Sequence, residues 1–158
     1  MVRQVRADPL DAAAFAPFGT VIEAGRGERR LINGGLCRRW HDQCRPDVQG
    51  GAACVSVFEA EPRALPYRLD LIERHPLGSQ AFLPLTAHPF LVIVSDGPEA
   101  APRAFLAAPH QGVQLRRGAW HGVLTPLHAP GLFAVIDYAG PEANLEEHRF
   151  DEPWDVAA

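Results

Sequence analysis

The sequence predicts an all-β protein built as a small antiparallel double-sheet barrel. Apolar residues fall in many short runs rich in β-branched and aromatic side chains, a composition that favours strands. The 15 prolines and 14 glycines separate these runs at short intervals, as turns between strands require. No long segment carries the periodicity of an amphipathic helix. Many short strands at near-regular spacing imply a sandwich or a barrel.

Individual strands follow from the same patterns. Residues 65–73 alternate apolar and polar positions, which predicts a half-buried strand. Residues 53–58 are apolar and β-branched, so we expect a buried strand there. A loop is expected over residues 25–30, and a strand pair or bulge interrupted by glycine over residues 31–42. The remaining expected strands cover residues 20–23, 80–84, 90–94, 103–107, 112–116, 122–124 and 132–138.

Helical structure is expected only near the two ends of the chain. One short helix is predicted over residues 8–19, with Asp8 as its N-cap, Pro9 at its first position, and Pro17 and Gly19 ending it. The charged segment 141–158 includes residues 144–148, for which we expect one helical turn.

Length and charge restrict the class of protein. A chain of 158 residues is long enough to bury a core, and we expect a single domain over residues 1–158. The net charge of −4 disfavours a nucleic-acid-binding surface. No apolar run is long enough to cross a bilayer, and the N-terminal residues lack the apolar core of a signal peptide. We therefore expect a cytoplasmic protein.

The basic residues and the cysteines exclude some kinds of catalytic and metal-binding site. All 15 basic residues are arginine, so a Schiff-base mechanism through lysine is excluded. Arginine instead favours bidentate binding of a carboxylate. Cys37, Cys44 and Cys54 lack the spacing of a paired metal site, and in a cytoplasmic protein they are interpreted as free thiols.

Four polar side chains from two distant segments are expected to meet. Glu73 and His75 are two residues apart, so in a strand they share a face. Gln80 returns to that face after a turn containing proline and glycine, and His121 follows a second segment punctuated by glycine. Imidazole, carboxylate and amide groups together can bind a divalent metal ion. The alternative is that the histidines only form local hydrogen bonds within their strands.

Three further candidates would bind substrate. Strand neighbours point to opposite faces, so an inward His121 selects Arg117 from its arginine pair, and an inward His41 selects Arg39. The alternative is that these arginines only balance surface acids. Asn33 precedes two glycines, where it would donate an amide hydrogen bond to a ligand or simply form a hairpin turn.

At these residues the chain resembles the ureidoglycolate lyase family, bacterial enzymes of allantoin breakdown. The resemblance runs nearly end to end, and its most specific part is the segment from Glu73 to Phe82. The other matching segments are Phe15-Ala16-Pro17-Phe18-Gly19, Ile32-Asn33-Gly34-Gly35, Arg39-Trp40-His41-Asp42, Arg117-Gly118-Ala119-Trp120-His121 and Asn144-Leu145-Glu146-Glu147-His148.

The resemblance implies a cupin-type antiparallel β-barrel, the jelly roll or double-stranded β-helix, and a homodimer. The general cupin pattern overlays as Glu73-x-His75-x(4)-Gln80 followed by Gly118-x-x-His121. Glu73 stands where that pattern has a histidine, and Gln80 stands where it has a glutamate. A divalent metal is implied as cofactor, nickel being the ion associated with the family.

The implied reaction converts (S)-ureidoglycolate to glyoxylate and urea in allantoin and purine nitrogen catabolism. We hypothesise that His75, Gln80 and His121 hold the metal, while Glu73 is either a fourth ligand or the base. Arg117 would bind the substrate carboxylate, assisted by Arg39 and Asn33. His41 or a metal-bound water would protonate the leaving urea.

Three alternatives stay open from the sequence. The chain could be a metal-free cupin that only binds a small carboxylate, or another metal-dependent cupin enzyme such as an oxygenase or isomerase. It could also follow the amidohydrolase route, which yields the same glyoxylate but releases ammonia rather than urea.

Overall fold

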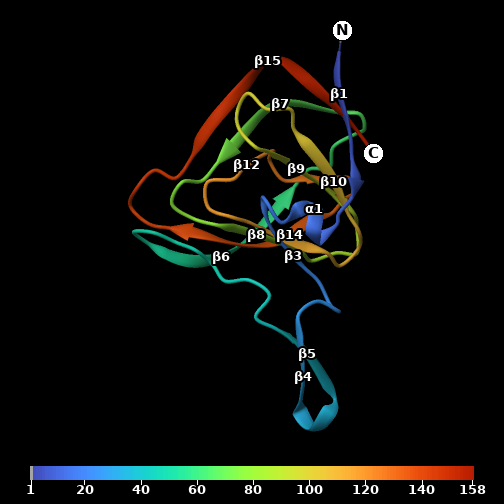
Figure 1. Cartoon of the computed structure of the whole chain (residues 1–158), viewed down its shortest axis with the longest axis vertical. Coiled ribbons are helices and arrows are strands. Elements are labelled where there is room, and N and C mark those ends of the chain that lie inside the picture. Colours follow the sequence, from blue (N-terminus) through green and yellow to red (C-terminus); the bar gives the residue numbers. More distant parts are fainter. Residues whose placement is uncertain (1) are drawn as a thin grey trace.

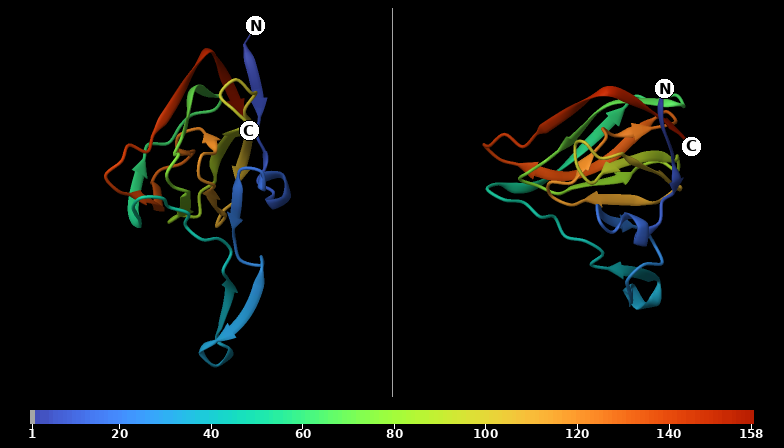
Figure 2. Two further views of the ribbon diagram at one scale, coloured as in Figure 1. Left: turned by 60° about the vertical axis from the view of Figure 1, so that its left-hand side comes forward. Right: turned by 45° about the horizontal axis from the view of Figure 1, so that its top comes forward.

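A computed structural model describes residues 2–158 and confirms the all-β prediction (Figure 1). Two β-sheets pack against one another and nearly close into a cupin-type barrel, with one short helix, α1 (Ala12–Phe15), beside them. A separate hairpin projects away from the barrel (Figure 2).

The larger sheet runs through seven strands in the order β1-β15-β7-β12-β9-β10-β2, and a short eighth strand, β13, pairs with β9. The smaller sheet has the order β3-β11-β8-β14-β6, and the projecting hairpin consists of β4 and β5. The bounds of these strands are β1 Arg3–Arg6, β2 Asp8–Pro9, β3 Gly19–Ile22, β4 Glu28–Ile32, β5 Cys37–His41, β6 Ala52–Ala60, β7 Tyr67–Arg74, β8 Gln80–Pro84, β9 Phe90–Ser95, β10 Arg103–Ala107, β11 Gly112–Leu115, β12 Trp120–His121, β13 Thr125–Pro126, β14 Gly131–Ala139 and β15 Glu146–Ala157.

The main core fills the space between the two sheets. Aromatic rings dominate it: Phe90 and Phe133 meet edge to face with centroids 4.9 Å apart, and Phe15 of α1 meets Phe105 at 5.8 Å. Burying one such ring stabilises the fold by roughly 1.5–3 kcal/mol. A second cluster, which includes Ile93, covers the other face of the larger sheet, so β9 is buried on both faces.

The helix prediction was right in kind but wrong in its bounds. Asp11, not Asp8, caps the helix, because its Oδ1 accepts a hydrogen bond from the Ala14 N–H at 2.9 Å. Asp8 and Pro9 instead form the edge strand β2, paired in parallel with β10. An edge strand tolerates proline because the missing N–H is not needed on its free side.

Four strand-level expectations also need correction. The expected strand 122–124 is absent within the described chain, and the shorter β12 and β13 flank that segment. The predicted helical turn at 144–148 belongs partly to strand β15, which pairs with β7. The loop expected over residues 25–30 is shorter than predicted, because strand β4 already begins at Glu28. Strand β6 is exposed at alternate positions rather than buried throughout, because one of its faces has no covering layer.

Two other sequence expectations can be compared with the structure. The three cysteines, all within the described residues, are free thiols as predicted. Between residues 2 and 158 the structure contains no helix long and apolar enough to cross a membrane.

Replacing Gly19 by alanine should destabilise the barrel, because β3 and β11 approach too closely there for a side chain. An added Cβ would lie 1.8 Å from the Gln114 carbonyl oxygen, a backbone atom that cannot move without breaking the sheet. We expect a loss of about 1–3 kcal/mol or more in urea unfolding. Gly97→Ala is the matched control, since a Cβ there has no neighbour within 4 Å. Equal stability of the two variants would contradict this account.

Candidate metal centre

Strand pairing brings the two distant histidine segments together. Antiparallel pairing of β12 with β7 sets His121 opposite Glu73, and His75 follows directly after the end of β7. Ligand atoms of these three side chains all lie within 4.8 Å of one another. We call Glu73, His75 and His121 the ligand cluster. The sequence predicted this convergence, and the structure brings the three side chains together.

A short backbone contact holds the two segments in place. The Gly118 N–H donates to the His75 carbonyl oxygen at 2.9 Å, which joins the turn before β12 to the end of β7. Gly118 adopts a φ of 79°, a left-handed conformation that favours glycine. The two imidazole centroids are 5.2 Å apart, and His75 Nε2 is 3.8 Å from Glu73 Oε1.

Backbone carbonyls orient both imidazoles in the same way. His75 Nδ1 lies 2.7 Å from the Asn144 carbonyl oxygen, and His121 Nδ1 lies 2.8 Å from the Gly122 carbonyl oxygen. A carbonyl only accepts hydrogen bonds, so each Nδ1 must carry the proton. In a neutral ring each Nε2 then carries a free lone pair, and both Nε2 atoms are buried without a hydrogen-bond partner in the described chain. Metal-binding histidines are held in this way.

The side-chain amide of Gln80, in the smaller sheet, is also held by a hydrogen bond at one end and free at the other. It begins β8 and shares a face with Phe82 of the core. Its Nε2 donates to Asp137 Oδ2 at 3.1 Å, and Asp137 Oδ1 accepts from Cys54 Sγ at 3.5 Å. An ionised carboxylate accepts but does not donate, so Asp137 fixes the amide with its nitrogen toward β14. The Gln80 Oε1 is therefore left buried and without a partner.

Burial also shifts the pKa values of His121 and Glu73. Desolvation lowers the pKa of His121 to about 4; the neighbouring His75 lowers it further, while the hydrogen bond to Gly122 opposes the shift. The His121 ring is therefore neutral at pH 7 and able to act as a ligand. Burial raises the pKa of Glu73, with His75 partly opposing the shift and Glu147 adding to it. A carboxyl with a raised pKa can accept and return a proton closer to neutral pH.

These donors fit a divalent cation. Two neutral imidazole nitrogens and one carboxylate form a donor set that transition metals accept, and an amide oxygen can add to it. The Nε2 atoms of His75 and His121 and the Gln80 Oε1 are buried without a hydrogen bond, and each would cost free energy if nothing bound it. The arrangement of Glu73, His75 and His121 is therefore compatible with a bound divalent ion.

Comparison with known proteins identifies the family of the chain. Residues 2–157 match the family described as ureidoglycolate lyase. The chain belongs to this family. It is 54% identical over 150 residues to "Ureidoglycolate lyase" of Rhodobacter capsulatus, covering 92% of this chain and 93% of that protein. A relative of the same name from Chelativorans is 48% identical over 160 residues, covering 98% and 97%. "Ureidoglycolate lyase 2" of Rhizobium meliloti is 47% identical over 153 residues, covering 94% of each chain.

Arg117 belongs to the turn that contacts the His75 backbone in this ureidoglycolate lyase family member. Its neighbour Gly118 contacts His75, and its Nε donates to Asp47 Oδ2 at 3.1 Å. The segment containing Asp47 is itself tied to the turn before β8, because the Ser79 N–H donates to the Asp47 carbonyl oxygen at 2.8 Å. Arg117 is thus held at the same group of turns as the histidines.

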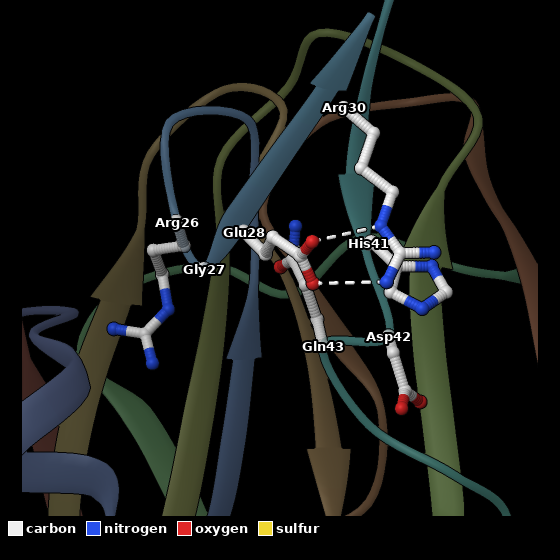
Figure 3. A pocket seen from close by; sticks show the side chains of 7 residues that line it. All are labelled: Arg26, Gly27, Glu28, Arg30, His41, Asp42 and Gln43. Atoms are coloured by element: carbon white, nitrogen blue, oxygen red, sulfur yellow. Dashed lines mark hydrogen bonds and ion pairs between the residues drawn. The ribbon is translucent and has the colours of Figure 1, made fainter. Parts of the chain in front are cut away.

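Asn33, Arg39 and His41 are not brought to the ligand cluster of their own chain. All three lie on the projecting hairpin, Asn33 in the 3-10 turn between its strands and the other two in β5. Asn33 has a φ of 53°, so it forms the turn that the sequence offered as an alternative. His41 lines a polar groove at the base of the hairpin, beside the Glu28–Arg30 ion pair (Figure 3).

Sequence reasoning missed two residues that support the cluster. Asn144 accepts hydrogen bonds from His75 through its backbone carbonyl and from the Leu77 N–H through its side chain, the latter at 2.7 Å. Asp137 orients Gln80. Asn144 lies in one of the segments that resemble the family, and this resemblance was the only sign in the sequence that it supports the site. The position of Asp137 opposite Cys54 emerges only from the register of β14 with β6.

The His121 ring should titrate near pH 4 in metal-free protein, measured by NMR of the ring protons. The unfolded chain binds this proton near pH 6.5 but the folded chain does not, so stability falls as pH drops from 6.5 toward 4. This contribution is on the order of 3 kcal/mol for the whole interval. Stability of the His121→Asn variant should depend less on pH over the same interval. A ring that titrates near 6.5 would contradict the burial argument.

Proposed function

We propose that this chain is a lyase that cleaves (S)-ureidoglycolate to glyoxylate and urea in allantoin and purine nitrogen catabolism. The observation that carries the proposal is the ligand cluster: two oriented imidazoles, of which His121 is buried, and a half-buried carboxylate with a raised pKa, all close together. The identity of the substrate is inferred from the relatives named ureidoglycolate lyase, which match this chain over nearly their whole length.

We propose that His75, His121 and Gln80 hold a divalent metal ion, nickel being the expected one. The buried, unpartnered Nε2 atoms of the histidines and the Gln80 Oε1 support this assignment. Once bound, such an ion would supply positive charge that stabilises an alkoxide and lowers the pKa of a substrate hydroxyl. A metal-free carboxylate-binding module is the weaker alternative, because it would leave these three atoms unsatisfied.

Glu73 is proposed as the group that moves the proton. The substrate carbon carries a hydroxyl, a carboxylate and the ureido nitrogen. As the hydroxyl loses its proton, its oxygen forms the carbonyl of glyoxylate and the C–N bond breaks, its electron pair going to nitrogen. The nitrogen of the leaving urea takes up one proton, so no proton is gained or lost overall. A single carboxyl with a raised pKa can accept the first proton and return it to the nitrogen.

Arg117 is proposed to bind the substrate carboxylate. Its Nε is paired with Asp47, and the remaining guanidinium donors make no hydrogen bond within the described chain. Planar donors of this kind match a carboxylate in a bidentate way. The ion pair with Asp47 would hold the guanidinium in place before substrate arrives.

The roles predicted for Asn33, Arg39 and His41 stay predictions. Their place on the hairpin gives them no contact with the ligand cluster of the same chain, and Glu73 supplies the proton transfer that was assigned to His41.

We propose three further properties on the same basis. The chain is one domain over residues 1–158, since both sheets share one core and the family match spans residues 2–157. The resemblance to the family suggests a homodimer that acts on a small molecule. A cytoplasmic location is supported by the three free cysteines.

Protein loaded with nickel or another divalent ion should release urea and glyoxylate in equal amounts from (S)-ureidoglycolate. His121→Ala should lower turnover by roughly 10²–10³-fold, because a preorganised electrostatic contact is lost. His128→Ala is the control, since this histidine is exposed and its ring stacks near His88, with centroids 5.4 Å apart, and not near the cluster. Release of ammonia in place of urea would overturn the lyase assignment, and normal turnover by His121→Ala would overturn the site.

Asp137→Asn should weaken metal binding about 10–100-fold in calorimetric titration, because the Gln80 amide is then free to turn its nitrogen toward the ion. Gln80→Ala should weaken binding to a similar extent. Asp70→Asn is the control, because Asp70 is exposed on β7 and pairs only with Arg68 in the described chain. If Gln80→Ala binds metal normally, Gln80 is not a ligand. If only Asp137→Asn binds normally, the orienting role of Asp137 is wrong.

A further inference from the structure

A second carboxylate lies beside Glu73 on the same face of the larger sheet. Strand β15 pairs antiparallel with β7, and the register sets Glu147 directly opposite Glu73. Residues directly opposite one another in an antiparallel pair point to the same face. On its other side β7 pairs with β12, where His121 is opposite the same glutamate. One line across three strands therefore runs from His121 through Glu73 to Glu147.

Glu147 is exposed at the edge of the sheet. At this level β15 pairs only with β7, because β1 joins β15 further along, at residues 154–157. The half-buried Glu73 lies between the exposed Glu147 and the buried His121. The charge of Glu147 also raises the pKa of Glu73, an effect that requires the two carboxyl groups to lie near each other. A small molecule bound at the ligand cluster therefore has Glu147 beside it at the sheet edge.

The start of β15 is tied to the ligand cluster by two contacts. The Asn144 carbonyl oxygen accepts a hydrogen bond from His75 Nδ1 at 2.7 Å, and Glu146 Oε2 accepts one from Arg74 Nε at 2.6 Å. Both contacts lie within three residues of Glu147. The Glu147 backbone is therefore held in place relative to the histidines before any ligand binds, which lowers the cost of binding.

The Glu147 carboxylate has no partner of its own. The side chain of the preceding Glu146 pairs with Arg74, whereas Glu147 forms neither an ion pair nor a side-chain hydrogen bond within residues 2–158. Like charges directly opposite each other destabilise an antiparallel pair. An ionised Glu147 opposite Glu73 therefore costs stability unless a hydrogen-bond donor or a cation offsets it. A ligand with N–H groups would supply such a donor.

The substrate of the proposed reaction has two chemically different ends. One end is a carboxylate, which suits a cation or an arginine. The other end is a ureido group, which presents two N–H donors side by side in one plane. A carboxylate accepts two parallel N–H donors in the same way when it pairs with arginine. Because Glu147 repels the substrate carboxylate, the ureido end is the one that it can bind.

The order of groups across the sheet matches the order of groups in the substrate. Arg117, proposed to bind the carboxylate, belongs to the turn that leads into β12. Glu73, proposed to move the proton at the reacting carbon, lies on β7 in the middle, and Glu147 lies on β15 at the far side. Neighbouring strands are about 4.8 Å apart, so β12 and β15 are about 10 Å apart. Long side chains that reach inward from both strands leave a gap suited to a small molecule.

We propose that Glu147 binds the ureido group of the substrate by accepting its two N–H donors, and that it thereby selects ureido acids over other 2-hydroxy acids. The inference rests on the proposed lyase function and adds a specificity-determining residue to that site. Glu147 takes no part in a covalent step, because it only holds the leaving urea while Glu73 transfers the proton. Glu146 cannot replace it, since neighbours in a strand point to opposite faces.

Binding of two substrate analogues to metal-loaded protein tests the proposal without turnover. N-carbamoylglycine retains the carboxylate and the ureido group but lacks the reacting hydroxyl, whereas glycolate retains the carboxylate and the hydroxyl but lacks the ureido group. In calorimetric titration, Glu147→Gln should weaken binding of N-carbamoylglycine about 10–100-fold, because hydrogen bonds to a charged acceptor are lost. Glycolate should bind as it does to the wild type. Glu146→Gln is the matched control and should bind both analogues normally.

Three outcomes of the titrations would overturn the proposal. The first is a wild type that does not bind N-carbamoylglycine. The second is a Glu147→Gln variant that binds this analogue normally, or that loses affinity for both analogues equally. The third is weaker binding of the metal ion itself by Glu147→Gln, which would make Glu147 a metal ligand. Circular dichroism checks that the variants are folded, as expected for changes at exposed positions.

Steady-state kinetics separates this proposal from the lyase function on which it rests. Wild-type protein that releases no urea would contradict the lyase function itself, before any variant is compared. With an active wild type, Glu147→Gln should raise KM for (S)-ureidoglycolate about 10–100-fold and change kcat far less, because the contact is present both before and during the reaction. A loss of kcat at unchanged KM would make Glu147 an acid–base group and overturn its assignment to the ureido group.

Discussion

Antiparallel pairing of β12 with β7 is the constraint on which the candidate site depends. It is a short pairing, and it sets His121 opposite Glu73 across a single register position. A shift of one residue would turn the His121 side chain to the other face of the sheet. The contact from Gly118 to His75 and the burial of β9 beside β12 keep that register in place.

Around this pairing, the polar groups are arranged so that their ligand atoms stay free. Backbone carbonyls hold the two imidazoles through Nδ1, and a carboxylate holds the Gln80 amide through its nitrogen. The groups that orient the ligands come from other parts of the chain: the loop before β15, the residue after β12, and β14. A buried polar network of this kind is costly when incomplete, so the unpartnered atoms support the proposal of a bound ion.

Much of the fold could be predicted because it follows from local patterns. Strands β8 and β10 have the predicted bounds, since each is a short apolar run ended by proline, glycine or a charge. The errors came where tertiary pairing overrides local preference. Asp8 and Pro9 resemble a helix start but pair with β10, and residues 146–148 resemble a helical turn but extend β15 along β7. Residues 53–58 were expected to be buried because composition does not show that one face of β6 lacks a neighbour.

By itself, the sequence determined the all-β class, the family, and the shared face of Glu73 and His75, because two-residue spacing and residue type are local properties. The pairing of β12 with β7 then brought His121 to that face. Only the tertiary structure decided which atoms of those side chains are free, which neighbours orient them, and that Asn33, Arg39 and His41 stand on a separate arm. Hydrogen bonds between segments some seventy residues apart, such as His75 to Asn144, and the exposure of a sheet face depend on how distant strands pack. No local pattern encodes that packing.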